Sequence, residues 1–115
     1  MSDLYEKPPC EFGCPVRRTA AIIEGKWTTL IVRDLLSGKK RYSELQRSLA
    51  GISPRLLAAR LKMLESERLV VRTQFPTIPP TTEYELTPLG QELLSVIAAM
   101  AAFGERLAGK EHYGD

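Results

Sequence analysis

Residues 43–66 read SELQRSLAGISPRLLAARLKMLES, and this stretch decides the fold. Ser43 is a good N-cap residue, and Gln46 stands three residues on as its capping-box partner, so a short helix is expected to begin here. Gly51 is the residue near which this short helix is expected to stop, because glycine tolerates the backbone conformation that ends helices.

A second helix is predicted directly after that turn. Ser53 followed by Pro54 has the form of an N-cap with proline at the first helical position. Leu57, Leu61 and Leu64 recur at i, i+4 and i+7, which places them on one face of an amphipathic helix. Two helices joined by so short a turn are typical of a helix–turn–helix motif.

Two further helices are predicted before the motif. Pro15 suits the first position of the earlier helix, and Gly25 ends it. Trp27 opens the later helix, which Gly38 ends. The connector at residues 39–41 is Lys-Lys-Arg and is expected to form at most a very short strand.

After the motif the hydrophobic period changes from 3.6 to 2. Residues 69–74 and 82–86 are two short runs typical of strands, and the prolines between them exclude one continuous strand. Thr87, followed by proline, begins a last helix that runs to Leu107. A helix–turn–helix followed at once by a β-hairpin is a winged helix. The expected fold is therefore mainly α with a small β-hairpin, a winged helix-turn-helix.

The length of 115 residues, with 43% hydrophobic, suffices for one folded domain and not for two. We expect a flexible N-terminal arm over residues 1–13, a winged helix-turn-helix domain with terminal dimerisation helices over 14–107, and a C-terminal tail over 108–115. No apolar run reaches the ~20 residues of a membrane span, and the acidic N-terminus lacks the form of a signal peptide. We therefore expect a cytoplasmic protein with no membrane partner.

The charge of the chain is unevenly distributed along the sequence. The total is only +2, from 16 Lys and Arg against 14 Asp and Glu. Residues 39–62 nevertheless hold seven Lys or Arg against one Glu, a net +6, whereas residues 83–115 hold two against six, a net −4. Such an asymmetry is typical of a protein that binds double-stranded DNA, although a merely solvated basic face is the alternative.

The exposed side of the second helix of the motif is the expected DNA-reading face. Arg55 stands in its first turn, where recognition helices point at base edges, and two small alanines allow close approach to the major groove. The hairpin loop at residues 75–82 carries no Lys or Arg, so the wing is expected to contact DNA more weakly than the helix. The expected DNA-binding residues are Lys40, Arg41, Ser43, Ser53, Pro54, Arg55, Ala58, Ala59, Arg60, Lys62, Arg72 and Thr77.

The last helix predicts a homodimer. Its apolar stripe is wider than one small core can cover, so a second copy is expected to bury the remainder, together with the helix that follows Pro15. The expected interface residues are Val16, Ala20, Leu93, Ile97, Met100, Phe103 and Leu107.

Several short blocks stand in a characteristic order along the chain. They are CPV at 14–16, GKW at 25–27, RYSEL at 41–45, GISP at 51–54, the spaced residues Leu57, Arg60, Leu61, Leu64 and Glu65, and the run from Pro79 to Gly90. As a set, these blocks resemble the HxlR-type branch of MarR-like winged-helix transcription regulators over about residues 14–107. The resemblance implies a homodimeric regulator on a pseudo-palindromic operator, with the helix that starts at Ser53 in the major groove. This chain has Glu24 before Gly25 where the family often has Gly-Gly.

Two cysteines form a candidate redox-sensing pair. Cys14 stands at a helix start, where the macrodipole and the nearby Arg17 and Arg18 favour the thiolate, and Cys10 could resolve an oxidised Cys14. The resemblance implies the same, because some family members sense oxidants or electrophiles at the position of Cys14. The alternatives are a cysteine that only packs the helix start, or a four-cysteine metal site in a dimer. Within one chain, no metal site and no cofactor are expected.

The sequence excludes the common enzyme classes. His112 is the single histidine, and no phosphate-binding loop, zinc-protease or serine-hydrolase motif is present. We therefore expect no enzymatic activity. Two alternatives stay open: a winged-helix regulator without a thiol switch that responds to a small-molecule ligand or to protein partners, and a winged helix used for protein contacts alone.

Overall fold

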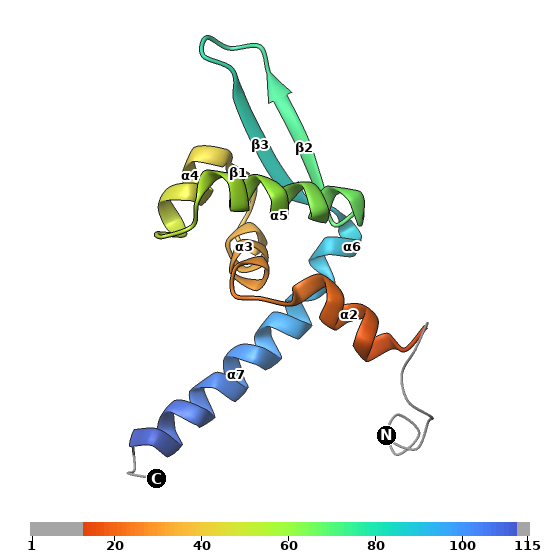
Figure 1. Cartoon of the computed structure of the whole chain (residues 1–115), viewed down its shortest axis with the longest axis vertical. Helices are drawn as coiled ribbons and strands as arrows, with labels where there is room; N and C mark the ends of the chain where they lie inside the picture. The colour runs from red at the N-terminus through yellow and green to blue at the C-terminus, as the bar shows by residue number, and fades with distance from the viewer. Residues whose placement is uncertain (1–12, 113–115) are drawn as a thin grey trace.

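The computed structural model describes residues 13–112, which are mostly helical with one small antiparallel sheet (Figure 1). A helix–turn–helix is followed by a β-hairpin, so the predicted winged helix-turn-helix is confirmed. The elements in chain order are α2 (Pro15–Ile23), α3 (Trp27–Leu36), β1 (Lys40–Arg41), α4 (Tyr42–Ser48), α5 (Pro54–Ser66), β2 (Val70–Phe75), β3 (Thr81–Leu86), α6 (Pro88–Gln91) and α7 (Leu93–His112). The expected arm at residues 1–13 lies almost wholly outside the described residues.

The hydrophobic core lies where α3, α4 and α5 meet the base of the sheet. Leu57, Leu61 and Leu64 are all buried, so the predicted inner face of α5 is confirmed. Leu45 of α4 and Tyr84 of β3 belong to the same buried cluster. This core holds the helix–turn–helix and the wing as one unit.

The sheet has three strands in the order β1-β3-β2, one more than the two of the predicted hairpin. The two-residue β1 pairs with β3, with Lys40 opposite Tyr84 and Arg41 opposite Glu83. The connector after Gly38 therefore does form the very short strand that its sequence suggested. The hairpin loop is shorter than expected, because Thr81 is already in β3 and pairs with Phe75.

Two of the three predicted helix caps are confirmed, and one is wrong. The Ser53 hydroxyl accepts a hydrogen bond from the Leu56 N–H at 3.1 Å, and the Thr87 hydroxyl accepts one from the Gly90 N–H at 3.0 Å. Ser43 is not the N-cap of α4, since the helix begins at Tyr42 directly after β1.

The N-terminus of α4 is capped by an acidic side chain instead of the predicted pair. Glu44 accepts a hydrogen bond from the Arg41 N–H at 2.8 Å, which is the reciprocal half of a capping box. Because β1 runs directly into α4, the N-cap position is Arg41, two residues before the expected Ser43, and Ser43 and Gln46 lie inside α4.

The last helix differs from the single continuous helix that the sequence predicts. It is divided into α6 and α7 at Glu92, and α7 continues past Leu107 to His112, into the expected tail. Figure 1 shows α7 pointing away from the hairpin and the helix–turn–helix. No helix among residues 13–112 has both the length and the apolar character needed to cross a membrane.

Candidate nucleic-acid interface

The outer face of α5 is exposed and basic. Arg55, Ala58, Ala59 and Lys62 are all exposed, on the side of the helix that turns away from the buried leucines. The two alanines remove bulk from the middle of this face, which allows the helix axis to approach a groove closely. The hydroxyl of Ser53 is already used as the helix cap.

A hollow of about 590 Å³, the α5–sheet hollow, lies between α5 and the base of the wing. It brings together three residues that the sequence predicts at DNA, Ala58 and Lys62 on α5 and Arg72 on β2. The whole lining consists of Ala58, Lys62, Glu65, Ser66, Arg72 and Tyr84. Two cations and one carboxylate leave this lining with a net positive charge.

Tyr84 is a site residue that the sequence reasoning missed. It is paired directly across the sheet with Arg72, and side chains of directly paired residues share one face. Burial raises the pKa of the Tyr84 hydroxyl above its ordinary value, while a hydrogen bond from Arg72 and the Arg72 charge act in the opposite direction. The sequence did carry a signal for this residue. Successive side chains of a strand point to opposite faces, so Tyr84, which stands between Glu83 and Glu85, is predicted on the inner face.

A second hollow, of about 230 Å³, joins the wing to the start of α4. It brings Arg41 and Ser43, both predicted at DNA, beside wing residues 80–82. Tyr42 also lines it, and its hydroxyl donates a hydrogen bond to the Pro54 carbonyl at 2.9 Å. That bond ties the first turn of α4 to the first turn of α5.

Three residues predicted to contact DNA point to other parts of the chain. The Arg60 guanidinium lies at the α2–α3 junction, where its Nη2 is 3.5 Å from the position that a Cβ on Gly25 would take. The Arg60 Nε is buried and has no hydrogen-bond partner within the described part of the chain. The Lys40 Nζ donates to the Ser37 hydroxyl at 3.0 Å, and the Thr77 hydroxyl donates to the Pro79 carbonyl at 2.8 Å.

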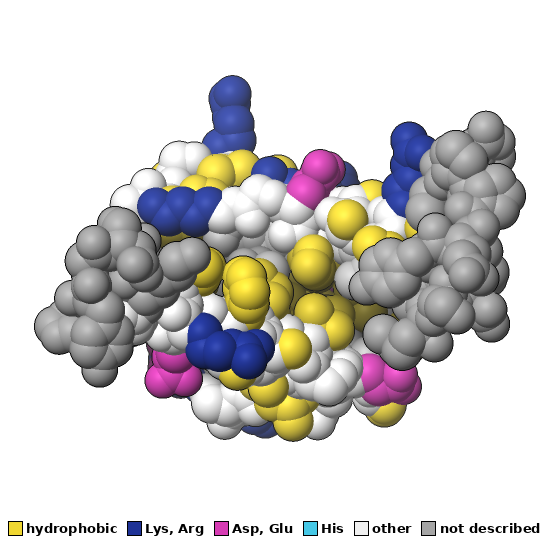
Figure 2. Space-filling model, turned by 90° about the horizontal axis from the view of Figure 1, so that it is seen from below, with side chains coloured by type: hydrophobic (Ala, Val, Ile, Leu, Met, Phe, Trp, Pro, Cys, Tyr) yellow, Lys and Arg dark blue, Asp and Glu magenta, His cyan; other side chains and the backbone are white. Residues whose placement is uncertain are grey.

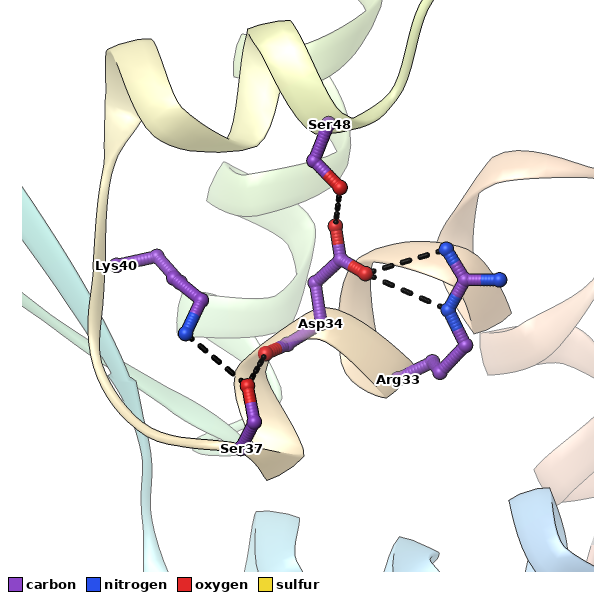
Figure 3. Close-up of polar contacts among 5 residues, drawn as sticks. All are labelled: Arg33, Asp34, Ser37, Lys40 and Ser48. Atoms are coloured by element: carbon purple, nitrogen blue, oxygen red, sulfur yellow. Dashed lines mark hydrogen bonds and ion pairs between the residues drawn. The ribbon is translucent and has the colours of Figure 1, made fainter.

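A polar network holds the helix–turn–helix against α3 (Figure 3). The Ser48 hydroxyl at the end of α4 donates to Asp34 Oδ2 at 2.6 Å. Arg33 donates to the other oxygen of the same carboxylate from Nε at 3.3 Å and from Nη2 at 3.2 Å. The Ser37 hydroxyl donates to the Asp34 carbonyl at 2.9 Å and accepts from Lys40, so the network reaches β1.

An apolar face lies on the α7 side of the molecule. Figure 2 shows hydrophobic side chains gathered at the centre of this view, with Lys and Arg side chains beside them. Five of the predicted interface residues are exposed, namely Val16, Ala20, Met100, Phe103 and Leu107. Leu93 and Ile97 instead pack partly against the core. Leu89 and Leu94 are exposed as well, but Leu94 lies about 180° round α7 from Phe103 and so on another side of the helix.

Cys14 stands directly before α2 as its N-cap residue, as the sequence predicts. Its sulfur is in a disulfide bond, and the chain has one other cysteine, Cys10, which lies outside the described residues. Among residues 13–112 no group of three or more His, Cys, Asp or Glu side chains is arranged to hold a metal ion.

Comparison with known proteins agrees with this architecture. The family model for the HxlR-like helix-turn-helix matches residues 22–112. The HTH-type transcriptional regulator YybR of Bacillus subtilis (strain 168) is 35% identical over 105 residues, which cover 91% of this chain and 84% of YybR.

Two solved structures are similar along most of their length. One, described as a MarR-family transcriptional regulator from Porphyromonas gingivalis W83, has a TM-score of 0.81 and 40% identity, with 86% of this chain and 97% of that chain covered. The other is the redox regulator HypR in its oxidised form, with a TM-score of 0.75 and 35% identity, covering 81% of this chain and 96% of HypR. The chain therefore belongs to the HxlR-like helix-turn-helix family and is a DNA-binding transcriptional regulator rather than an enzyme.

Proposed function

We propose that this chain acts in the cytoplasm as a homodimer on a pseudo-palindromic operator, with α5 of each subunit in the major groove. The observation that carries the proposal is the outer face of α5, where exposed Arg55 and Lys62 flank two exposed alanines. An arginine in the first turn suits bidentate contact with guanine, and a lysine farther along suits a phosphate. The α5–sheet hollow adds Arg72 beside Lys62, so the positive surface continues from the helix to the wing.

Binding to an operator selected from a randomised duplex pool tests this assignment. Arg55→Ala is expected to weaken operator binding by about 1–3 kcal/mol and to relax selectivity at one base pair. Lys62→Ala is expected to weaken all duplexes alike and to reduce the slope of log affinity against log salt by about 1. Arg106→Ala removes the same charge from exposed α7 and serves as the matched control. Normal operator binding by Arg55→Ala would show that the reading face is placed wrongly.

The homodimer is supported by the apolar face of α7. Phe103 and Leu107 are 57% and 48% exposed, which is unusual for two large side chains one turn apart. Met100 of the same helix and Val16 of α2 are 45% and 62% exposed, and a helix of a second copy would cover these side chains. A twofold dimer would place its two copies of α5 to read two half-sites about 34–36 Å apart.

We infer further that the oxidation state of Cys14 regulates DNA binding. Cys14 is the N-cap residue directly before α2, and it is disulfide-bonded in this structure. The redox regulator HypR shares the fold and 35% of its residues over the matched region. Since α2 lies beside the proposed dimer surface, a change at Cys14 would move α2 and with it the spacing of the two α5 helices.

A further inference from the structure

The tip of the wing is an apolar surface with no charge. Residues 75–80 read FPTIPP, and every one of them is exposed. Ile78 is 100% exposed, whereas the other exposed large hydrophobic side chains of the described residues range from 36% to 62%. Ile78 therefore contributes nothing to the core, and its exposure has no folding explanation.

The tip is held in shape by its own hydrogen bonds. The Thr77 hydroxyl donates to the Pro79 carbonyl at 2.8 Å and lies 3.2 Å from the Thr81 hydroxyl. Three prolines further restrict the backbone. The polar side chains are thus engaged within the loop while Ile78 is presented outward, so little conformational entropy remains to be lost when the tip binds.

The tip is continuous with the surface proposed to face DNA. The hollow at the start of α4 joins Pro80, Thr81 and Thr82 to Arg41 and Ser43. Figure 1 shows the hairpin projecting beyond α4 and α5, at the end of the molecule opposite the C-terminal end of α7. The tip is therefore not next to the proposed dimer surface.

The reach of the hairpin matches the spacing of the DNA grooves. β2 has six residues, which at ~3.3 Å per residue span about 20 Å. One turn of B-DNA is about 34–36 Å, so the minor groove lies roughly 17 Å along the helix axis from the neighbouring major groove. A wing of this length can reach the flanking minor groove while α5 occupies the major groove.

We propose that this wing enters the minor groove beside each half-site through apolar contact by Ile78 and the prolines, and not through a cation. The proposal rests on the proposed DNA-binding function. The Ile78 side chain carries no hydrogen-bond acceptor, so a guanine N2 amino group that it covers loses its water without a replacement. That amino group is the feature that distinguishes G·C from A·T in the minor groove, so the tip should select A·T flanks. Apolar side chains at such steps also unstack base pairs and bend the duplex.

Inosine substitution gives a sharp test. Three duplexes with identical half-sites would carry A·T, G·C or I·C pairs at the flanking steps. An I·C pair keeps the major-groove edge of G·C but lacks the minor-groove amino group. Wild type is expected to bind A·T and I·C flanks alike, and both about tenfold more tightly than G·C flanks.

Variants assign that selectivity to the tip. Ile78→Ser is expected to reduce the tenfold preference to less than twofold with an unchanged salt slope. Val71→Ser removes an exposed apolar group from near the base of the hairpin and is expected to keep the full preference. Ile78→Lys is expected to lose the preference and to steepen the salt slope by about 1, because it adds a phosphate contact.

Three results would overturn the proposal. They are equal wild-type binding to all three duplexes, I·C flanks that behave like G·C flanks, and a preference that survives in Ile78→Ser. Each can occur while the half-sites are still bound and Arg55→Ala still weakens binding. Loss of binding to every duplex by the wild-type protein would instead reject the proposed function itself.

Discussion

The Ser48 hydroxyl donates a 2.6 Å hydrogen bond to the Asp34 carboxylate and so joins the end of α4 to α3. α3 belongs to the hydrophobic core, and α4 precedes the turn into α5. The position of α4, and of α5 that follows it, therefore depends in part on a contact between residues fourteen positions apart in the chain. Asp34 has a side chain that is only 12% exposed, whereas its other partner, Arg33, is 54% exposed.

Ser48→Ala is expected to lower the free energy of unfolding by about 1–2 kcal/mol, because a charge-assisted hydrogen bond to a shielded carboxylate is lost. Arg33→Ala is the matched comparison and is expected to change stability by less than about 1 kcal/mol, since the Arg33 side chain is 54% exposed and water screens its charge. Urea denaturation of the three proteins measures both differences. A larger effect in Arg33→Ala would mean that the ion pair, and not the hydroxyl contact, holds α4.

Gly90→Ala is expected to destabilise the protein by at least about 2 kcal/mol. A Cβ at this position would lie 2.1 Å from the Leu69 carbonyl oxygen, so the backbone of α6 or of the β2 start must move. Gly109→Ala in α7 has nothing within 4 Å of the added Cβ and is expected to be neutral or stabilising by up to about 1 kcal/mol. Thermal or chemical unfolding of the pair checks the contrast, and equal effects would contradict it.

The stability of the protein is expected to fall with rising pH above the ordinary Tyr pKa of 10.0, in part through Tyr84. Because burial raises the pKa of Tyr84 in the folded chain, the unfolded chain loses that proton first, and unfolding becomes more favourable as pH rises. The stabilisation is fully present below pH 10 and disappears through the alkaline range. Tyr84→Phe is therefore expected to show a shallower decline between pH 9 and pH 11, and parallel curves for the two proteins would reject this role.

Phe103→Glu is expected to convert the proposed dimer into a monomer at micromolar concentration. A carboxylate at the centre of the apolar face of α7 would be buried without a partner in the dimer. Ala98→Glu adds the same charge five residues away, about 140° round the helix, and is expected to leave the dimer intact. Sedimentation velocity distinguishes the two states, and a stable wild-type monomer would refute the dimer directly.

Oxidation is expected to change operator affinity reversibly through Cys14. Diamide removes two electrons and two protons from a pair of thiols as the disulfide forms, and dithiothreitol returns them. Cys14→Ser is expected to bind the operator like the reduced wild type and to ignore diamide. Identical responses of wild type and Cys14→Ser would show that the cysteine has only a packing role.

Cys10→Ser separates the possible bridges. Loss of the oxidant response in this variant indicates a Cys10–Cys14 bond, and a retained response indicates a Cys14 bridge between subunits or a mixed disulfide with a small thiol. Non-reducing electrophoresis with intact-mass measurement identifies the product in each case.

The sequence by itself determined the elements that depend on local interactions. Helical spacing located the buried leucines of α5, Ser53 and Thr87 marked two helix starts, and the change of period marked the hairpin. These features arise within a few residues along the chain, where the spacing of side chains and the nearest polar group decide the conformation. The basic segment at residues 39–62, and with it the exposed basic face of α5, was predictable for the same reason.

Only the tertiary structure decided what depends on partners distant in the chain. The pairing of β1 with β3 shifted the start of α4 and replaced Ser43 with Glu44 as the capping residue. The Arg60 guanidinium lies beside Gly25 at the α2–α3 junction, and pairing across the sheet puts Tyr84 beside Arg72. The close approach of Gly90 to Leu69 fixes α6 against the start of β2. In each case the contact is made by a segment distant in the chain, and the local spacing of side chains does not specify it.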